Sequence, residues 1–409
     1  MRRDSPAVPL KRRSREASNI TALYVDEVSS ESKNTQRQNQ QLPNRFKLES
    51  DAERKHKRSG SSGSNFRRKV QHRAWTYRLV SPAAEQFRDV RGELGTKVSL
   101  AGVTPDDRSV RYPFDDEQER LYTPSEWSKR YKSEELVAKF LKFCEETTEK
   151  TRKTVKCELN VPYGPTERAK YDIYGTDLPK DAPIFVFIHG GYWQEFSKDL
   201  TGFSVPLFIK NKIKVITIGY DLCPNVRLGD IVAEIKSAVA QILKYAADSG
   251  SKYVCVAGHS AGAHLAACLL HDNDWIDLMT QQGYFALLKE IILIGGIYNL
   301  RPIINISFAA ALKLTDEEIK ALSLSTLDKA KGHRITNLKV TVTVGDCDSP
   351  AFVDESREYA QKLISIVDNV EYLLLQDIDH FDIVEKLLDP NYDLAKLILK
   401  CLQPDAILC

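Results

Sequence analysis

Apolar residues from about residue 121 onward fall into short continuous runs. Such runs predict buried strands of a parallel sheet, because helices cover both faces of that kind of sheet. The predicted strands span residues 154–159, 171–174, 184–188, 213–218, 253–257, 291–295, 338–344 and 370–375.

Between these runs, apolar residues recur every three or four positions, as they do on one face of a helix. The residues before such a stretch, Ser133 with Glu134 and Glu135, are typical of a helix start. Helices are therefore predicted from Ser133 onward and over residues 231–243, 263–270, 356–366 and 392–402. The alternation predicts an α/β fold with a mostly parallel sheet covered by helices, and we assign residues 119–409 to one domain.

The first 75 residues differ from the rest in charge and in apolar content. They hold 18 Lys and Arg against 8 Asp and Glu, whereas the remaining chain is acidic. Because they contain polar stretches and few apolar clusters, burial cannot offset the entropy lost on ordering. We predict a disordered basic tail over residues 1–75. Residues 76–118 show no clean period and are either a linker or an N-terminal extension of the domain.

Other features of the composition bear on where the protein works. No segment reaches the roughly 18 apolar residues of a membrane helix, and the charged start has no apolar core behind it. The eight cysteines are scattered without a CxxC pair, which predicts free thiols, a reducing compartment and no zinc framework. We therefore expect a cytoplasmic protein without a membrane partner. The oligomeric state is left open, with a homodimer as one outcome.

Two basic clusters in the tail, residues 11–15 and 54–58, leave nuclear entry open. Similar clusters can contact nucleic acid or anionic lipid. They also occur often in chains without such partners, so we interpret them as solvated charge with no specific nucleic-acid partner.

A Gly-His-Ser-Ala-Gly sequence at residues 258–262 follows one predicted strand and precedes a helix. A nucleophile elbow requires this context, because its glycines allow a sharp turn that lifts the serine hydroxyl above the sheet. The helix that follows directs its dipole and free N–H groups at the same place. Ser260 is therefore predicted to be a catalytic nucleophile rather than part of a plain turn.

A second glycine-rich motif directly follows the predicted strand 184–188. Its five residues are His189, Gly190, Gly191, Tyr192 and Trp193. Acyl transfer needs N–H donors where the oxyanion forms, and hydrolases draw them from an HGG loop and from the residue after the nucleophile. We expect the oxyanion hole to consist of the N–H groups of Gly191, Tyr192 and Ala261. The alternative, a Gly-Gly turn with aromatic core residues, is disfavoured because the loop occurs together with the Gly-His-Ser-Ala-Gly motif at residues 258–262.

The base and its orienting acid are expected after the late strands, in the chain order Ser, acid, His. His380 follows the strand 370–375 and is the last histidine of the chain, and Asp348 follows the strand 338–344. We predict that His380 is the base and that Asp348 is its acid.

Several other residues compete for these roles. Asp346 is a rival acid two residues before Asp348. Three carboxylates flank the base and are interpreted as solvated or as local hydrogen-bond partners: Asp377, Asp379 and Asp382. We expect His264 to pack in the core, and His189 and His259 to fix the loop and the elbow through hydrogen bonds.

Taken together, these motifs resemble those of the eukaryotic kynurenine formamidases, also called arylformamidases. The likeness rests on HGGYW, on GHSAGAHL, on DSP at Asp348 and on DHF around His380, and it extends to YTPSEW at residues 122–127. It covers residues 120–400 approximately, as one catalytic domain with the α/β-hydrolase fold. The family usually has DSPEF where this chain has Ala351, a change that leaves the triad intact but alters the local pocket.

The resemblance implies a serine hydrolase that cleaves the formamide of N-formyl-L-kynurenine to L-kynurenine and formate, in the kynurenine pathway of tryptophan catabolism. The reaction would pass through a formyl-serine at Ser260 and would need neither a cofactor nor a metal. One alternative is a general carboxylesterase or lipase-like hydrolase with the same machinery. Another is a non-catalytic binding module of this fold, against which the intact Ser260, Asp348 and His380 argue.

Overall fold

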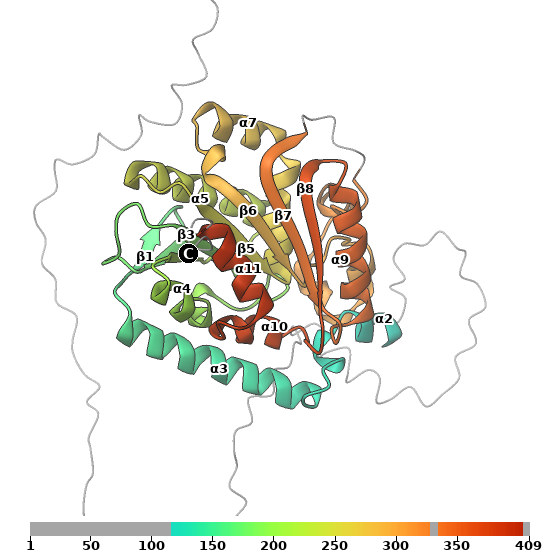
Figure 1. Cartoon of the computed structure of the whole chain (residues 1–409). Coiled ribbons are helices and arrows are strands. Elements are labelled where there is room, and N and C mark those ends of the chain that lie inside the picture. Colours follow the sequence, from blue (N-terminus) through green and yellow to red (C-terminus); the bar gives the residue numbers. More distant parts are fainter. Residues whose placement is uncertain (1–115, 328–333, 404–409) are drawn as a thin grey trace, which may run out of the picture. The chain divides into compact units, whose positions relative to one another are not determined.

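The structure, a computed structural model, describes residues 116–327 and 334–403 of the chain (Figure 1). The predicted basic tail and all but the last residues of the segment 76–118 lie outside the described residues. Within the described part, no helix combines the length and the apolar character needed to cross a bilayer.

An eight-stranded sheet forms the centre of this domain, with the strand order β1-β2-β4-β3-β5-β6-β7-β8. The strands are β1 (Cys157–Pro162), β2 (Lys170–Tyr174), β3 (Ile184–Ile188), β4 (Lys214–Ile218), β5 (Val254–His259), β6 (Leu288–Ile294), β7 (Ile335–Gly345) and β8 (Val367–Leu375). The pairs β1–β2 and β2–β4 are antiparallel and all others are parallel. Every residue of β3, β4 and β5 is buried, as their continuous apolar runs predict.

Helices cover both faces of the sheet (Figure 1). The helices longer than one or two turns are α3 (Ser133–Thr154), α5 (Leu228–Ser249), α6 (Ala261–Cys268), α7 (Asn273–Gln281), α9 (Pro350–Leu363) and α11 (Asp393–Leu402). Residues of α5, α6 and α9 join one apolar core, and residues of α3 and α11 join a second core. The sheet therefore separates two cores, as the sequence predicts for a doubly covered sheet.

Every strand and helix predicted from the pattern is present, with bounds shifted by a few residues. The pattern does not predict five further α-helices: α2 (Asp116–Leu121), α4 (Pro206–Lys210), α7, α8 (Asp316–Leu322) and α10 (Asp382–Glu385). These helices have between four and nine residues, too few for a helical period to be recognised.

One shift changes the type of structure, at the end of α3, where a strand was expected from residue 154. The helix continues to Thr154 and β1 begins only at Cys157. Threonine by itself favours strands. In the last turns of α3, however, threonine side chains bind a distant loop: the hydroxyl of Thr148 accepts a hydrogen bond from Gly202 N at 2.8 Å. The hydroxyl of Thr151 donates to the Gly202 carbonyl at 3.1 Å. These contacts with a distant loop hold the last turns of α3 in helical form.

The parallel strands point their carboxyl ends toward the side of the domain where α10 and the short α2 (Asp116–Leu121) lie (Figure 1). Between β6 and β7, residues 296–327 form a segment of short helices, which we call the cap segment. It lies against the loop after β3, because Gln194 Nε2 donates to the Phe308 carbonyl at 3.1 Å. This end of the sheet is where the predicted catalytic residues meet.

Candidate active site

Ser260 lies at the turn between β5 and α6, in the middle of the sheet. Its φ of 57° and ψ of −121° fall outside the regions that an L-residue prefers. A Cβ atom at Gly258 would lie 2.1 Å from the Gly262 carbonyl oxygen, and one at Gly262 would lie 2.3 Å from that of Ile188. Both glycines are therefore required by space, and the strained turn has the shape of a nucleophile elbow.

The loop after β3, residues 189–193, lies directly against this elbow; we call it the oxyanion loop. A Cβ atom at Gly190 would lie 2.9 Å from Ser260 Cβ. Gly191, Tyr192 and Trp193 have φ values of 105°, 49° and 58°. Among the described residues, nothing accepts a hydrogen bond from the backbone N–H of Gly191 or Tyr192. The loop thus leaves N–H donors free beside the serine, as an oxyanion hole requires.

His189 and Trp193, the first and last residues of the oxyanion loop, hold the loop in place by packing against neighbouring rings. His189 stacks on Tyr220 with ring centres 4.1 Å apart, and its Nδ1 lies 2.8 Å from the Gly190 carbonyl oxygen. Burial lowers the pKa of His189 to about 3, so the ring is neutral and Nδ1 donates to the carbonyl. Trp193 is fully buried and packs edge-on against His264 at 5.1 Å. These residues shape the loop and do not reach the reacting atoms.

His380 and Asp348 form a buried pair, with His380 Nδ1 and Asp348 Oδ2 2.7 Å apart. The other carboxylate oxygen accepts the Ser349 N–H at 2.7 Å, which fixes the orientation of Asp348. Gly295 closes the space behind the pair, because a Cβ there would lie 3.2 Å from His380 Nδ1. Phe352 contacts the imidazole edge-on at 4.8 Å. The Nδ1 side of the ring is thus enclosed by protein.

His259 connects the elbow to the base. Its Nε2 donates to the His380 carbonyl at 2.8 Å, and burial lowers its pKa well below the usual value, so the ring stays neutral. In the described part of the chain, the Ser260 hydroxyl makes no hydrogen bond to His380. Such nucleophile–base contacts often form only when substrate is bound, so their absence here does not argue against the pair.

The rival carboxylates differ from one another in burial. Asp346 and Asp377 are exposed, and Asp346 Oδ1 accepts the Asp377 N–H at 2.8 Å. Asp379 and Asp382 are not solvated, which corrects one of the two interpretations from the sequence, because both are buried. The other interpretation holds for Asp379, whose Oδ1 accepts the backbone N–H groups of Phe381 and Asp382.

One group of side chains within the described residues is spaced closely enough to hold a metal ion. It consists of Asp346, Cys347 and Asp377, whose ligand atoms lie within 4.8 Å of one another. This group does not include Ser260, His380 or Asp348. No described residue of the catalytic arrangement therefore depends on it.

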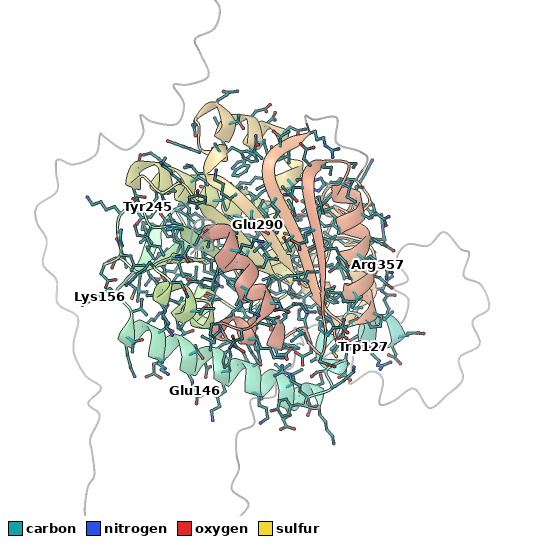
Figure 2. The ribbon with its side chains drawn as sticks, in the orientation of Figure 1. Trp127, Glu146, Lys156, Tyr245, Glu290 and Arg357 are labelled. Carbon is teal, nitrogen blue, oxygen red and sulfur yellow. The ribbon has the colours of Figure 1, made fainter. Side chains whose placement is uncertain are left out.

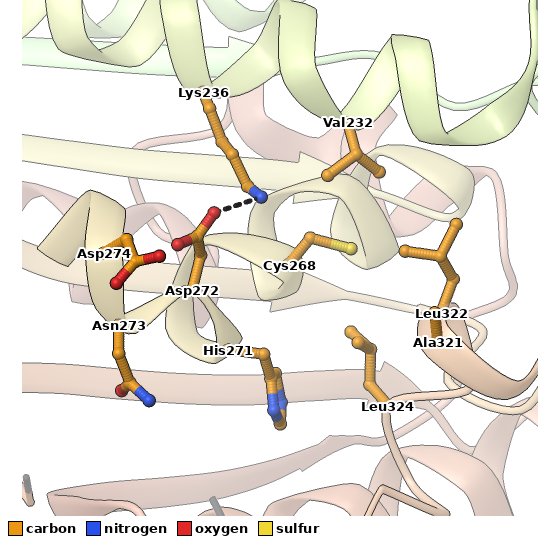
Figure 3. Close-up of a pocket in the computed structure, with 10 residues that line it drawn as sticks. All are labelled: Val232, Lys236, Cys268, His271, Asp272, Asn273, Asp274, Ala321, Leu322 and Leu324. Carbon is orange, nitrogen blue, oxygen red and sulfur yellow. Dashed lines mark hydrogen bonds and ion pairs between the residues drawn. The ribbon is translucent and has the colours of Figure 1, made fainter. Parts of the chain in front are cut away.

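A cavity of about 320 Å³ lies at the other end of α6 from Ser260 (Figure 3). Lys236, Cys268, His271 and Asp272 line it, and Lys236 forms an ion pair with Asp272. Because Cys268 is the last residue of α6 and Ser260 precedes its first, the cavity is separated from the elbow by the length of the helix. It is not the catalytic pocket.

Sequence reasoning does not identify three residues that the structure places around the site: Tyr122, Arg130 and Glu355. Tyr122 belongs to the YTPSEW stretch that carries part of the resemblance, which is the one signal in the sequence. The contacts of Arg130 and Glu355 join residues more than 200 positions apart, and no local pattern records them.

The sheet order, the elbow at Ser260 and the His–Asp pair after the late strands define an α/β-hydrolase. Residues 171–339 match the BD-FAE family model. The chain belongs to the kynurenine formamidase family, since it is 35% identical to kynurenine formamidase of Danio rerio over 287 residues, 70% of this chain and 95% of the relative. The Drosophila melanogaster kynurenine formamidase is 28% identical over 62% of this chain and 83% of the relative.

A solved Silicibacter structure described as a thioesterase has a TM-score of 0.57 and 26% identity, covering 69% of this chain and 98% of that one.

Proposed function

We propose that this chain hydrolyses the formamide bond of N-formyl-L-kynurenine and releases L-kynurenine and formate. Family membership supports the substrate. The observation that carries the reaction type is the buried pair of His380 and Asp348 beside a strained Ser260, with free N–H groups next to the serine. This combination is what nucleophilic acyl transfer needs.

In the first half of the reaction, the Ser260 hydroxyl oxygen attacks the formyl carbon while His380 Nε2 takes its proton. Asp348 holds the imidazole in the tautomer with hydrogen on Nδ1 and stabilises the imidazolium that forms. The carbonyl oxygen becomes an oxyanion, which accepts hydrogen bonds from the N–H groups of Gly191, Tyr192 and Ala261.

The intermediate then collapses, the bond from carbon to nitrogen breaks, and His380 gives its proton to the departing arylamine. Ser260 is left as a formyl ester. A water molecule, deprotonated by His380, attacks that ester, and formate leaves as the serine regains its proton. Atoms balance with water as the second reactant, so no further reagent is required.

Aromatic side chains lie next to the oxyanion loop and the base, which suits an aryl substrate. Tyr192, in the oxyanion loop, contacts Phe308 of the cap segment with ring centres 4.3 Å apart. Phe352 lies edge-on to His380. Planar rings prefer such edge and face contacts, worth about 0.5–1.5 kcal/mol each beyond the area they bury.

The test is formate release from N-formyl-L-kynurenine by the wild-type protein and by the Ser260→Ala variant. Removal of such a nucleophile lowers turnover by about 10⁴- to 10⁶-fold, while the fold should be retained. Ser365→Ala is the matched control, because Ser365 is exposed in the turn before β8 and should leave turnover unchanged. Wild-type turnover by the Ser260→Ala variant would refute the proposal.

A second candidate is a general esterase or thioesterase, which the likeness to the Silicibacter structure favours. Its chemistry would use the same serine and base. A substrate panel separates the two functions, because a formamidase should prefer formylkynurenine to short acyl esters and thioesters in kcat/KM.

A further inference from the structure

Residues 119–130, which we call the clasp segment, lie ahead of α3 at the carboxyl ends of the parallel strands (Figure 2, where Trp127 is labelled). The segment is braced internally. Trp127 Nε1 donates to the Arg120 carbonyl at 2.8 Å, and the Arg120 guanidinium lies 4.3 Å from the centre of the indole ring. Glu119 accepts hydrogen bonds from the N–H and the hydroxyl of Ser307 in the cap segment.

Tyr122 joins the clasp segment to the oxyanion loop and to α9. Its carbonyl accepts a hydrogen bond from the hydroxyl of Tyr192, the residue we assign to the oxyanion hole. Its own hydroxyl donates to Glu355 Oε1 at 2.5 Å, and Glu355 Oε2 accepts the N–H groups of Tyr298 and Asn299. Tyr122 and Glu355 are buried, so water does not compete for these contacts.

The turn that carries the acid is held in the same way. The carbonyl of Leu121 accepts a hydrogen bond from the Ser349 hydroxyl, and the Ser349 N–H donates to Asp348. Ser349 is fully buried. The clasp segment is therefore separated from the acid by one residue.

The turn that carries the base is held by an ion pair. Arg130 donates from Nε and Nη2 to the two oxygens of Asp379, at 2.7 and 2.9 Å, and the Ser128 hydroxyl donates to Asp379 Oδ2 at 2.6 Å. Burial alone would raise the pKa of Asp379, but these hydrogen bonds lower it below the usual value. Asp379 directly precedes His380, so this two-point contact acts one residue from the base.

We propose that the clasp segment fixes the oxyanion loop, the Asp348 turn and the His380 turn relative to one another, with Tyr122 and Arg130 as positioning residues of the active site. The proposal rests on the proposed function only for the role of Ser260 and His380. The sheet spaces the strands β3, β7 and β8 that precede these three loops, but the loops themselves extend beyond its last paired residues. A misplacement of about 1 Å at a catalytic site can cost about 10²-fold in rate, so a segment that bonds to all three loops bears directly on turnover.

The experiment compares Arg130→Ala, Arg130→Lys and Tyr122→Phe in the full chain. Two readouts are taken: turnover of N-formyl-L-kynurenine, and the rate at which a fluorophosphonate labels Ser260. We expect Arg130→Ala to lower kcat and the labelling rate about 10- to 100-fold with KM changed less than about threefold. Arg130→Lys keeps the charge without the two-point contact and should recover part of the loss.

The matched controls are Arg357→Ala and Tyr131→Phe. Arg357 lies exposed on α9 (labelled in Figure 2) and pairs with Asp354, and Tyr131 is an exposed ring just past the clasp segment. Both variants should behave as the wild type. If Arg130→Ala does not fold, Tyr122→Phe removes one hydroxyl and is expected to lower the labelling rate at least threefold.

Wild-type labelling rates in Arg130→Ala and Tyr122→Phe, or in whichever of the two folds, would overturn the positioning role. If instead the wild-type protein labels at Ser260 but releases no formate, the proposed substrate is wrong, and the labelling rates of the variants still decide the positioning role. The two failures are therefore distinguishable.

Discussion

The two halves of the candidate site are held together by different forces. On the nucleophile half, Gly190, Gly258 and Gly262 allow backbones to approach closely, and Ser260 sits in a strained turn fixed by those contacts. On the base half, hydrogen bonds and ion pairs between side chains and distant backbone groups hold the turns that carry Asp348 and His380.

This difference has consequences for how each half responds to change. Close backbone contacts depend on space alone and do not titrate or respond to salt. A network of buried side chains depends on each donor and each charge, and a missing partner leaves a buried polar group unsatisfied. The nucleophile half should therefore fail through steric changes, whereas the base half should fail through changes of a single polar atom.

The largest effect is expected from one atom in the base half. In the Asp348→Asn variant, the Ser349 N–H keeps the amide oxygen, so the NH₂ group faces His380 Nδ1 and forces the ring into the wrong tautomer. We expect turnover to fall about 10⁴-fold with the fold retained. The control is Asp346→Asn, whose oxygen can still accept the Asp377 N–H. Steady-state kinetics of both variants give the answer, and a larger loss at residue 346 would reassign the acid.

A purely steric change tests the nucleophile half. In the Gly262→Ala variant the new Cβ would lie 2.3 Å from the Ile188 carbonyl oxygen and 2.5 Å from that of His189. We expect the free energy of unfolding to drop by about 3 kcal/mol. Gly229→Ala, in the first turn of α5, is the matched control, because nothing lies within 4 Å of its Cβ position. There we expect a gain of about 0.5 kcal/mol, measured by urea unfolding. Equal unfolding free energies for the Gly262→Ala and Gly229→Ala variants would mean that the backbone around the elbow can move apart to accept a Cβ atom.

A smaller effect, confined to the base half, depends on pH. Burial raises the pKa of Glu355 to about 7, so the folded protein binds this proton more tightly than the unfolded chain does. The stabilisation is complete below the usual pKa of 4.5 and is lost as the pH rises through 7. Relative to a Glu355→Gln variant, the wild type should lose about 2 kcal/mol of unfolding free energy between pH 5 and pH 7.

The measurement is the urea midpoint of wild type and variant at both pH values. Glu134→Gln is the control, since Glu134 is exposed in the first turn of α3. A difference between wild type and the Glu355→Gln variant that stays constant with pH would mean that Glu355 ionises freely in the folded state.

The same division explains what the sequence could predict. The nucleophile half is contiguous: glycines at fixed spacing after apolar strands specify both the turn at Ser260 and the loop at Gly191, so local reading suffices. The strands β3, β4 and β5 could also be predicted from the sequence, because complete burial makes most of their positions apolar. The mostly parallel sheet with helices on both faces then follows from the alternation of strands and helices.

The base half could be predicted from the sequence only in part. The positions of Asp348 and His380 follow from the order of the late strands, and the structure brings them together. What holds them does not follow, because Asp379 reads as one of several carboxylates near a histidine. Its burial results from pairing with Arg130, 249 residues earlier in the chain, and no local period encodes such a partner.

That separation also sets an order in time during synthesis. Arg130 leaves the ribosome long before Asp379, and at about 5–20 residues per second the interval is roughly 12 to 50 seconds. Over that interval the elbow and the oxyanion loop can already be formed, since both lie within residues 189–262. Ser128 and Arg130 must wait without their partner Asp379 until the last strand and its turn appear. A nascent chain of this protein thus acquires its nucleophile early and its working geometry only after Asp379 and His380 have been added.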